Sequence, residues 1–475
     1  MSRLTRRELL AGAAGAGLGW AGATLPARWL ADPDRPPELY ESFVDCFWFD
    51  AAGLREGPLR PPLAGDQRAD VAILGGGFTG LATAYHLARR NPSRRIVVLE
   101  GARCGYGASG RNGGFADRTY TGFPDYVAAH GPERARPVYD AIALGMASIE
   151  RFVAEHGVDC DLERNGSLRM AAGDAQVEAL AAAVEAARGL GIGARLVEGA
   201  ELRALVHTER FPAGMLAPDT AILNPAKLAR GMLRVVESLG VEVFEATRVL
   251  RVEPGDPLRI RAELGTVSAP RAVIALNGYA PQIGVLARRL VPLANYVVAT
   301  EPLSPQQWEA IGWSGRQGLS DARVQFMYLR PTADGRIVAG GEGAPYTYGS
   351  RPSSGIDASV VERLRRSLLE TFPQLAGIRF THAWGGTMAF TRDFTPRIGS
   401  LDDAGRLAFG LGYCGEGVVM SQLFGRLLAA VVDGQRRELD GLPFLGVPPW
   451  VGPEPLRALG VRAAERALRW LAHEP

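Results

Sequence analysis

Three glycines and one glutamate in the first quarter of the chain have the types and spacing needed to hold a nucleotide. Gly75, Gly77 and Gly80 form a GxGxxG turn. In such a turn the first glycine permits a tight bend, the second lets a pyrophosphate approach the backbone, and the third lets the next helix pack closely on the preceding strand. Glu100 lies roughly twenty residues further on, where an acidic side chain meets the hydroxyls of a ribose. This pattern predicts a dinucleotide site.

The segments around the glycine turn are those that would position it. Residues 71–74 are apolar and predict a buried strand, residues 78–90 predict a helix, and residues 96–99 predict a second strand that ends at Glu100. The N-terminus of the helix would face the two phosphates, so its first residues, Phe78 and Thr79, join the expected contacts. A buried turn with a capping glutamate is the alternative interpretation, but it does not account for strand, spacing and acid together.

A second glycine-rich loop follows at residues 104–114, with the sequence CGYGASGRNGG. It is too polar and too rich in backbone N–H donors to be an ordinary connection. A site for a nicotinamide dinucleotide would not need this second loop.

At these motifs the sequence resembles the D-amino-acid oxidase superfamily of FAD enzymes, in particular the branch that contains γ-glutamylputrescine oxidase. The matching stretches are GGGFTGL at 75–81, LE at 99–100 and GASGRNGG at 107–114, and further matches extend almost to the C-terminus. In that family the second loop runs beside the diphosphate and ring of the flavin. The resemblance therefore implies FAD as the cofactor, with contacts from Ser109, Gly110, Arg111, Asn112, Gly113 and Gly114.

Two later stretches also match the family. Relatives hold the adenine with a backbone amide and carbonyl at the position of Val249. Residues 410–417 (GLGYCGEG) open a helix through Val432, whose positive end would face the N1–C2=O edge of the flavin, where negative charge gathers on reduction. The resemblance places a last set of residues at the flavin: Gly412, Gly415, Glu416, Gly417 and Val418.

This loop departs from the family at one position. Close relatives usually carry histidine where this chain has Glu416. Since a carboxylate turned towards the flavin edge would oppose the developing charge, we expect the side chain to be neutral or directed away. Cys414 raises the alternative of a covalent flavin link, but relatives with Ser or Asn at this place bind FAD non-covalently, and we expect the same here.

The residues expected to line the substrate side lie later in the chain. Residues 324–341 predict a hairpin with its turn at 333–335, and Tyr328 and Arg330 project from one face of its first strand. In this superfamily such a sheet covers the flavin, where an arginine can bind a substrate carboxylate bidentately. Trp384, in a matching Trp-Gly motif, completes this catalytic set. A solvated strand end or an ion pair is the alternative role for Arg330.

The expected fold is α/β: a discontinuous, Rossmann-like FAD-binding domain with an inserted α+β substrate domain of mainly antiparallel sheet. The expected segments are a signal at 1–30, an extended lead-in at 31–68, the FAD-binding domain at 69–130, 212–285 and 380–440, the substrate domain at 131–211 and 286–379, and a C-terminal tail and helix at 441–475.

The N-terminus carries targeting information. Arg6 and Arg7 precede a Gly/Ala-rich apolar run, and Ala21-Gly22-Ala23 offers a small-residue cleavage site. This resembles a twin-arginine signal and predicts export, already folded with FAD, through the twin-arginine machinery to the periplasm. An uncleaved signal would instead leave the protein associated with the membrane.

Composition excludes some functions. The formal charge of +2 gives no reason to expect nucleic acid as a partner. The four cysteines lack the spacing of a metal site, so neither a metal nor a disulfide framework is expected.

The expected reaction is oxidation of the C–N bond of an amine or amino acid. Hydride would pass from the α-carbon to flavin N5, and the imine would hydrolyse to an aldehyde or keto acid, with O2 as electron acceptor and H2O2 as product. Two alternatives stay open: a dehydrogenase that passes electrons to a respiratory quinone or other carrier, and a flavin-binding partner subunit without turnover.

Overall fold

The computed structural model describes residues 46–55, 57–352 and 355–471. The expected signal at 1–30 and the lead-in up to residue 45 lie outside the described residues. In the described part, none of the helices combines the length and the apolar character that crossing a membrane requires.

A six-stranded sheet forms the base of the nucleotide-binding half. Its strand order is β19-β20-β13-β2-β3-β9, and all neighbours are parallel except β19 and β20. The strands are β2 (Val71–Leu74), β3 (Ile96–Leu99), β9 (Glu242–Phe244), β13 (Arg271–Ile274), β19 (Arg397–Ser400) and β20 (Leu407–Leu411).

Alternate residues of β2 enter two different cores, because successive side chains of a strand point to opposite faces. Val71 and Ile73 pack against helices, whereas Ala72 and Leu74 pack against a second, four-stranded sheet. The helices are α3 (Phe78–Arg90), α5 (Phe123–His156), α8 (Pro225–Ser238) and α11 (Gly417–Val432). The small sheet has the order β1-β12-β11-β10, formed by β1 (Gly65–Arg68), β10 (Val249–Glu253), β11 (Leu258–Ala262) and β12 (Gly265–Ala269). Covered on both faces, the parallel sheet needs the continuous apolar strands that the sequence supplies.

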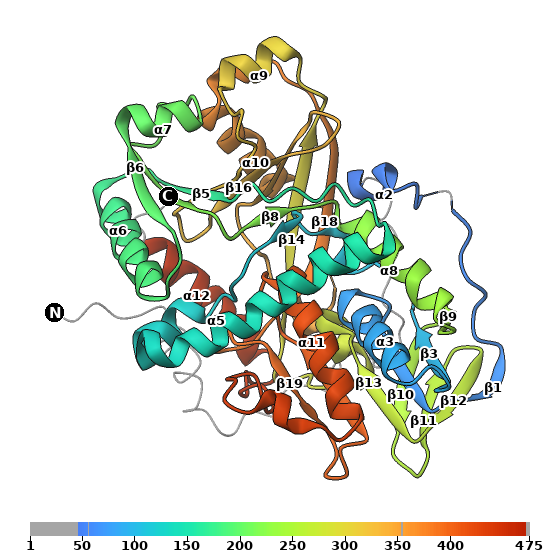
Figure 1. Cartoon of the computed structure of the whole chain (residues 1–475). Helices are drawn as coiled ribbons and strands as arrows, with labels where there is room; N and C mark the ends of the chain where they lie inside the picture. The colour runs from blue at the N-terminus through green and yellow to red at the C-terminus, as the bar shows by residue number, and fades with distance from the viewer. Residues whose placement is uncertain (1–45, 56, 353–354, 472–475) are drawn as a thin grey trace.

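The other half is an eight-stranded sheet with the order β18-β14-β17-β16-β15-β5-β7-β6, in the upper part of Figure 1. Every neighbouring pair is antiparallel except β15 and β5. The strands are β5 (Ser167–Ala171), β6 (Arg195–Glu198), β7 (Ala213–Ala217), β14 (Val291–Thr300), β15 (Gly318–Asp321), β16 (Met327–Pro331), β17 (Ile337–Gly341) and β18 (Phe380–Phe390). The predicted hairpin is confirmed, since β16 and β17 pair with Met327 opposite Gly341.

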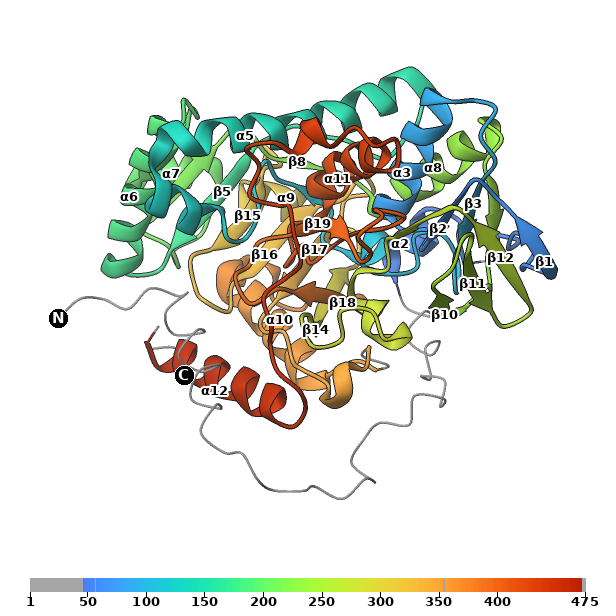
Figure 2. The same cartoon turned by 90° about the horizontal axis from the view of Figure 1, so that it is seen from below.

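Shorter elements complete the fold. They are α2 (Phe47–Ala51), α4 (Ala108–Arg111), β4 (Phe115–Ala116), α6 (Asp174–Gly189), α7 (Gly199–Leu205), β8 (Ala221–Ile222), α9 (Pro305–Ile311), α10 (Ala358–Thr371), α12 (Leu456–Leu471) and the 3-10 turns at Asn277–Ile283, Tyr348–Ser350, Pro373–Leu375 and Arg436–Leu439. Figure 2 shows α12 beneath the eight-stranded half, well separated from α3 and α8.

Two expected domain boundaries fall inside elements that the structure keeps whole. The boundary at 130/131 lies within α5, at a kink where Gly131 has φ 77° and Pro132 follows. The boundary at 379/380 assigns β18 to the FAD-binding domain, but β18 pairs with β14 along most of its length and belongs to the eight-stranded sheet. Long strand pairing, rather than the motif beside it, decides where residues 380–390 lie.

Candidate active site

A cavity of about 1170 Å³ lies at the carboxyl ends of β2, β3 and β13. This edge is where open α/β sheets bind ligands. Its walls come from the first glycine turn, the second glycine-rich loop, Thr247–Arg251, the turn after β13 and the loop before α11. Segments spread over most of the chain therefore form one elongated site, called here the first cavity.

The glycines of the first turn are required by close approach. Gly75 has φ +104°, and a Cβ on it would lie 2.7 Å from the carbonyl oxygen of Ala275. A Cβ on Gly77 would lie 2.8 Å from Ser109 Oγ, and one on Gly80 would collide with the carbonyl oxygen of Gly75. The absence of side chains thus leaves space beside the backbone at the start of α3, as binding of a pyrophosphate needs.

The second glycine-rich loop packs directly on the first. The backbone N–H of Phe78 donates to Ser109 Oγ at 2.9 Å, and the N–H of Gly105 donates to the carbonyl of Gly76 at 2.9 Å. These bonds bring Ser109 and Asn112 into the wall of the first cavity.

Glu100 occupies the expected position beside the turn. Its carboxylate accepts hydrogen bonds from the N–H groups of Gly76 at 2.8 Å and Ala102 at 2.9 Å. Burial raises the pKa of Glu100 to about 7, against the lowering effect of those two bonds. The carboxyl group is thus held against the glycine turn, where it lines the cavity.

The loop before α11 also lines the first cavity and contacts the first glycine turn. The N–H of Gly412 donates to Asn277 Oδ1 at 3.0 Å, and the hydroxyl groups of Thr79 and Tyr413 lie 2.7 Å apart. Gly415 has φ +104° and Gly417 begins α11, so the start of this helix is directed at the cavity.

The predicted cofactor residues fall into three groups. Those that line the first cavity are Gly75, Gly77, Phe78, Thr79, Glu100, Ser109, Asn112, Val249, Gly415, Gly417 and Val418. Those that line only the second cavity, described below, are Arg111, Gly113 and Glu416. Gly80, Gly110, Gly114 and Gly412 line neither and shape the turns instead. The individual FAD contacts stay predictions.

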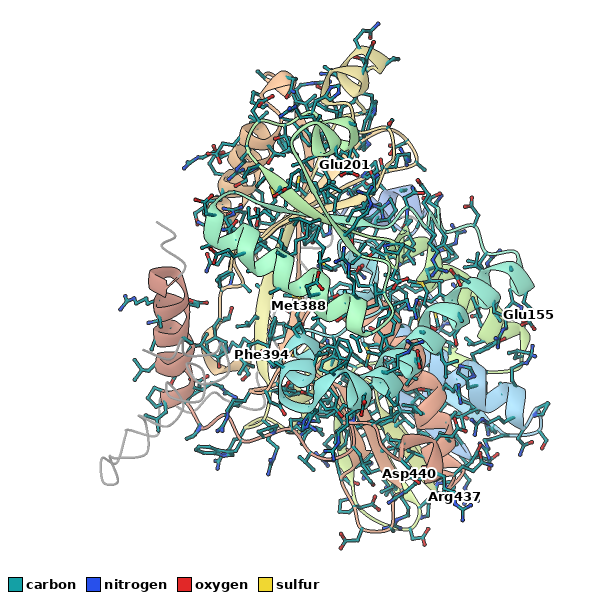
Figure 3. The ribbon with its side chains drawn as sticks, turned by 60° about the vertical axis from the view of Figure 1, so that its left-hand side comes forward. Glu155, Glu201, Met388, Phe394, Arg437 and Asp440 are labelled. Atoms are coloured by element: carbon teal, nitrogen blue, oxygen red, sulfur yellow. The ribbon has the colours of Figure 1, made fainter. Side chains whose placement is uncertain are left out.

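A second cavity, of about 950 Å³, extends from the same loops towards α12. The two cavities meet at five residues: Ala108, Asn112, Met388, Gly415 and Val418. In Figure 3, Met388 and Phe394 lie on the side of the body that faces α12, and both line this second cavity. A flavin ring at the junction would therefore be open to a molecule in the second cavity.

Tyr328 lines the second cavity, as expected for a substrate-facing residue. Its ring stands edge-on to Phe115 at 5.4 Å, and a side chain on Gly113 would collide with it. Burial raises the pKa of the Tyr328 phenol above its usual value, and Glu416 adds to this shift. Tyr328 stays neutral, and its role in catalysis stays a prediction.

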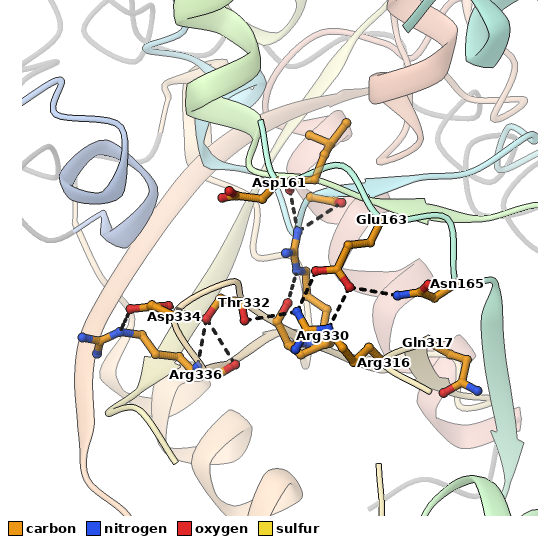
Figure 4. Close-up of polar contacts among 12 residues, drawn as sticks. Asp161, Glu163, Asn165, Arg316, Gln317, Arg330, Thr332, Asp334 and Arg336 are labelled. Atoms are coloured by element: carbon orange, nitrogen blue, oxygen red, sulfur yellow. Dashed lines mark hydrogen bonds and ion pairs between the residues drawn. The ribbon is translucent and has the colours of Figure 1, made fainter. Parts of the chain in front are cut away.

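Arg330 was expected beside Tyr328 on the substrate face, and the structure corrects this. Its side chain is 1% exposed and lines neither cavity. The guanidinium donates to the carbonyls of Leu223, Gly114 and Pro331, and Figure 4 shows it close to the Arg316–Glu163 ion pair. Two residues advance a strand by about 7 Å, which carries Arg330 out of the cavity and under the second glycine-rich loop.

Trp384 was also expected to line the substrate site, and this expectation is wrong. The side chain is fully buried, and its Nε1–H donates to the carbonyl of Arg111 at 2.8 Å. It packs edge-on against Trp48 of α2, at 6.2 Å between ring centroids. The segment before β1, which brings Trp48 to this place, is what covers it.

The side chain of Arg111 joins the second loop to β18. Its Nε donates to the carbonyl of Tyr106 at 2.7 Å and its Nη1 to the carbonyl of Gly385 at 2.9 Å. The guanidinium also lies over the ring of Tyr106. The buried part of this side chain therefore fixes the loop that carries Ser109 and Asn112.

Several lining residues were missed from the sequence. Tyr279, Tyr413 and Met388 line the first cavity, and Asp117 lines the second. Tyr413 stands inside the recognised motif at 410–417, which could have identified it. Asp117 has no such signal, since it follows a two-residue strand, β4, that pairs with β8 about a hundred residues later.

Comparisons with known proteins agree with this geometry. A family model described as FAD dependent oxidoreductase matches residues 70–431. The γ-glutamylputrescine oxidoreductase of Escherichia coli (strain K12) is 31% identical over 395 residues, which cover 82% of this chain and 89% of the relative. The glycine oxidase of Geobacillus kaustophilus (strain HTA426) is 24% identical over 388 residues, which cover 80% of this chain and 96% of the relative.

Solved structures show the same fold. The glycine oxidase from Geobacillus kaustophilus aligns with a TM-score of 0.69 at 22% identity, over 81% of this chain and all of the other. The L-proline dehydrogenase from P. horikoshii aligns with a TM-score of 0.67 at 18% identity, over 79% of this chain and 96% of the other. The predicted fold class is thereby confirmed.

Proposed function

Because this chain belongs to the family of FAD-dependent oxidoreductases that includes glycine oxidase and γ-glutamylputrescine oxidoreductase, we propose that it oxidises the C–N bond of a small amine. The predicted FAD cofactor and enzyme class are confirmed: the chain is an FAD-dependent oxidoreductase acting on amines or amino acids. The finer reaction is an imine-forming oxidation whose product hydrolyses to an aldehyde or keto acid.

The observation that carries this proposal is the junction of the two cavities at Met388, Gly415 and Val418. The first cavity fits FAD, because the Gly77 backbone can be approached closely and Glu100 stands beside it. When bound, FAD supplies N5 as the acceptor of a hydride. The residues of the second cavity then have to orient the substrate and exclude water, and its walls include the apolar side chains of Phe115, Met388 and Phe390.

The direct test is anaerobic mixing of the purified holoenzyme with a panel of primary amines, secondary amines and amino acids. We expect at least one of them to bleach the flavin absorbance. If FAD is bound and no member of a broad panel reduces it, the chain is instead a flavin-binding subunit without turnover of its own.

We further propose O2 as the electron acceptor, with H2O2 as product. The alternative is a quinone or another respiratory carrier, which an exported flavoprotein would meet. If air reoxidises the substrate-reduced enzyme at least as fast as the enzyme turns over, and stoichiometric H2O2 forms, the oxidase is supported. Slow reoxidation by air together with fast reoxidation by a soluble quinone supports the dehydrogenase.

We also propose that the protein is exported by the twin-arginine route and acts in the periplasm. The paired Arg6 and Arg7 before the apolar run support this proposal. A route that carries folded proteins also suits a chain that must collect FAD in the cytoplasm.

A further inference from the structure

Two carboxyl groups line the second cavity next to its junction with the first. Glu416 stands between Gly415 and Gly417 in the loop before α11, and Asp117 follows β4 directly. Thr220 donates its hydroxyl to Asp117 at 2.5 Å. In contrast, the Glu416 carboxylate makes no hydrogen bond within the described part of the chain.

Two aromatic rings belong to the same part of the cavity, since Phe115 lies two residues before Asp117 and the charge of Glu416 acts on Tyr328. Phe115 and Tyr328 stand edge to face nearby. Carboxylates and aromatic rings together are groups that bind an organic ammonium.

The buried and half-buried arginines of the same cavity are already engaged. Arg118 pairs with Asp219 at 3.1 Å, and Arg323 pairs with Asp321 and Glu342. Arg457 pairs with Glu454 at 3.1 Å, and Arg111 donates to backbone carbonyls. Two further lining arginines, Arg169 and Arg392, are exposed. Among the described lining residues, no buried or half-buried arginine is therefore free to bind a substrate carboxylate.

Glu416 and Asp117 influence each other's ionisation. Burial raises the pKa of Glu416 to about 8, and the charge of Asp117 adds to this shift. Burial also raises the pKa of Asp117. Two carboxyl groups in one poorly hydrated site disfavour double ionisation until a cation enters between them.

We infer that Asp117 and Glu416 form the binding site for the cationic nitrogen of the substrate, whose proton an ionised carboxylate of the pair accepts before hydride leaves the α-carbon, so that the cavity selects amines without a carboxylate near that nitrogen over α-amino acids. This inference rests on the proposed function for the identity of the substrate cavity. It also gives the departure at Glu416 a role, because the carboxyl group faces the substrate cavity and not the first one.

The test is calorimetric titration of the FAD-loaded enzyme with three probes of similar size: tetramethylammonium, tert-butyl alcohol and pivalate. We expect tetramethylammonium to bind at least roughly tenfold more tightly than the neutral and anionic probes. Tighter or equal binding of pivalate would overturn the inference. Since none of the probes is oxidised, the result does not depend on turnover.

Variants locate the site. Glu416→Gln and Asp117→Asn should each raise the dissociation constant of tetramethylammonium by roughly tenfold. Glu465→Gln is the matched control, because Glu465 lines the same cavity from α12, and it should change the constant less than about twofold. An unchanged constant in Glu416→Gln contradicts the assignment.

If a variant loses FAD, the pH dependence of tetramethylammonium binding to the unmodified enzyme tests the site instead. The titratable groups that act on Glu416 or sense its charge are Asp117 after β4, Tyr328 on β16 and Cys414 in its own loop. Tyr328 and Cys414 have raised pKa values and stay neutral, so binding of the cation should tighten as the pH rises towards 8 and the carboxyl groups ionise. Binding that is independent of pH between 6 and about 8 would contradict the site.

The amine panel separates the two ideas. If the cation binds but no panel member reduces the flavin, the proposed reaction is wrong and the cation-binding site is still supported. If α-amino acids reduce the flavin faster than simple amines do, the proposed reaction is supported and the inferred selectivity for amines is wrong.

Discussion

The hydroxyl oxygens of Thr79 and Tyr413 lie 2.7 Å apart although 334 residues separate them along the chain. Thr79 belongs to the first turn of α3 and Tyr413 to the loop before α11, and both side chains are buried. This bond joins the first glycine turn to the loop before α11. Removing either hydroxyl leaves the other buried without its partner.

We therefore expect Thr79→Val and Tyr413→Phe each to weaken FAD binding by about 1–2 kcal/mol, or roughly fivefold to thirtyfold. The double variant should lose less than the product of the two single effects, because the second substitution removes a group that is already unpaired. Dissociation constants of FAD, measured by fluorescence for all four proteins, check this. Independent, multiplicative effects would show that the two hydroxyls are not coupled.

FAD binding should depend on pH through Glu100, whose pKa is raised to about 7 by burial. Ribose hydroxyl groups donate to the ionised carboxylate, so the complex has a lower pKa than the free site. The complex then holds fewer protons, and affinity rises with pH until Glu100 is ionised in both states, above about pH 7. Titration of the apoprotein with FAD from pH 5.5 to about 8.5 measures this.

The control for that titration is Glu100→Gln. It should bind FAD more weakly at neutral pH, by roughly tenfold to a hundredfold, and lose the pH dependence. The relative rates with different amines should not change, since Glu100 does not line the second cavity, where the substrate is proposed to bind. If the pH dependence of FAD binding persists in this variant, another titratable group causes it.

Gly77→Ala should reduce FAD affinity by more than about tenfold. The added Cβ would lie 2.8 Å from Ser109 Oγ and would push apart the two loops between which the pyrophosphate is expected to bind. Gly173→Ala is the matched control, because Gly173 precedes α6 in an extended conformation and a Cβ there meets nothing within 4 Å. Equal FAD affinity in both variants would show that the approach to Gly77 is not needed.

Arg330→Met should destabilise the enzyme without changing its substrate preference. The buried guanidinium bonds three carbonyl groups and lies 5.0 Å over the ring of Trp48. Losing these bonds costs roughly 2–3 kcal/mol of unfolding free energy, seen as a lower melting temperature. The exposed Arg392→Met serves as control and should leave stability unchanged. If Arg330→Met selectively loses activity towards carboxylate-bearing substrates, Arg330 does act in the substrate site.

Replacing both Arg6 and Arg7 with lysine should retain the protein in the cytoplasm with FAD still bound. The paired arginines carry the expected export signal, whereas every lining residue of the first cavity lies downstream of it. Cell fractionation followed by flavin absorbance of each fraction measures both properties. Arg3→Lys, upstream of the pair, is the control and should be exported normally. If the variant with both arginines replaced is exported as efficiently as the unmodified protein, the twin-arginine assignment is wrong.

What the sequence determined by itself is local. The sequence identified the glycine turn at 75–80, the strands on either side of it and Glu100. This was possible because a few consecutive residues are enough to show the period of a strand or a helix and the composition of a turn. The hairpin of β16 and β17 was predictable for the same reason. The resemblance to a known family then supplied the cofactor and the class of reaction.

What only the tertiary structure decided is what covers each of those elements. A period of two residues placed Tyr328 and Arg330 on one face, but the packing of the second glycine-rich loop left one in a cavity and buried the other. Asp117 and Glu416 line one cavity, although about three hundred residues separate them, because β4 pairs with β8 and α11 packs against α5 and α3. Side-chain charge is a property of the sequence, whereas the neighbours that desolvate and pair a charge come from contacts between distant segments, which no local pattern encodes.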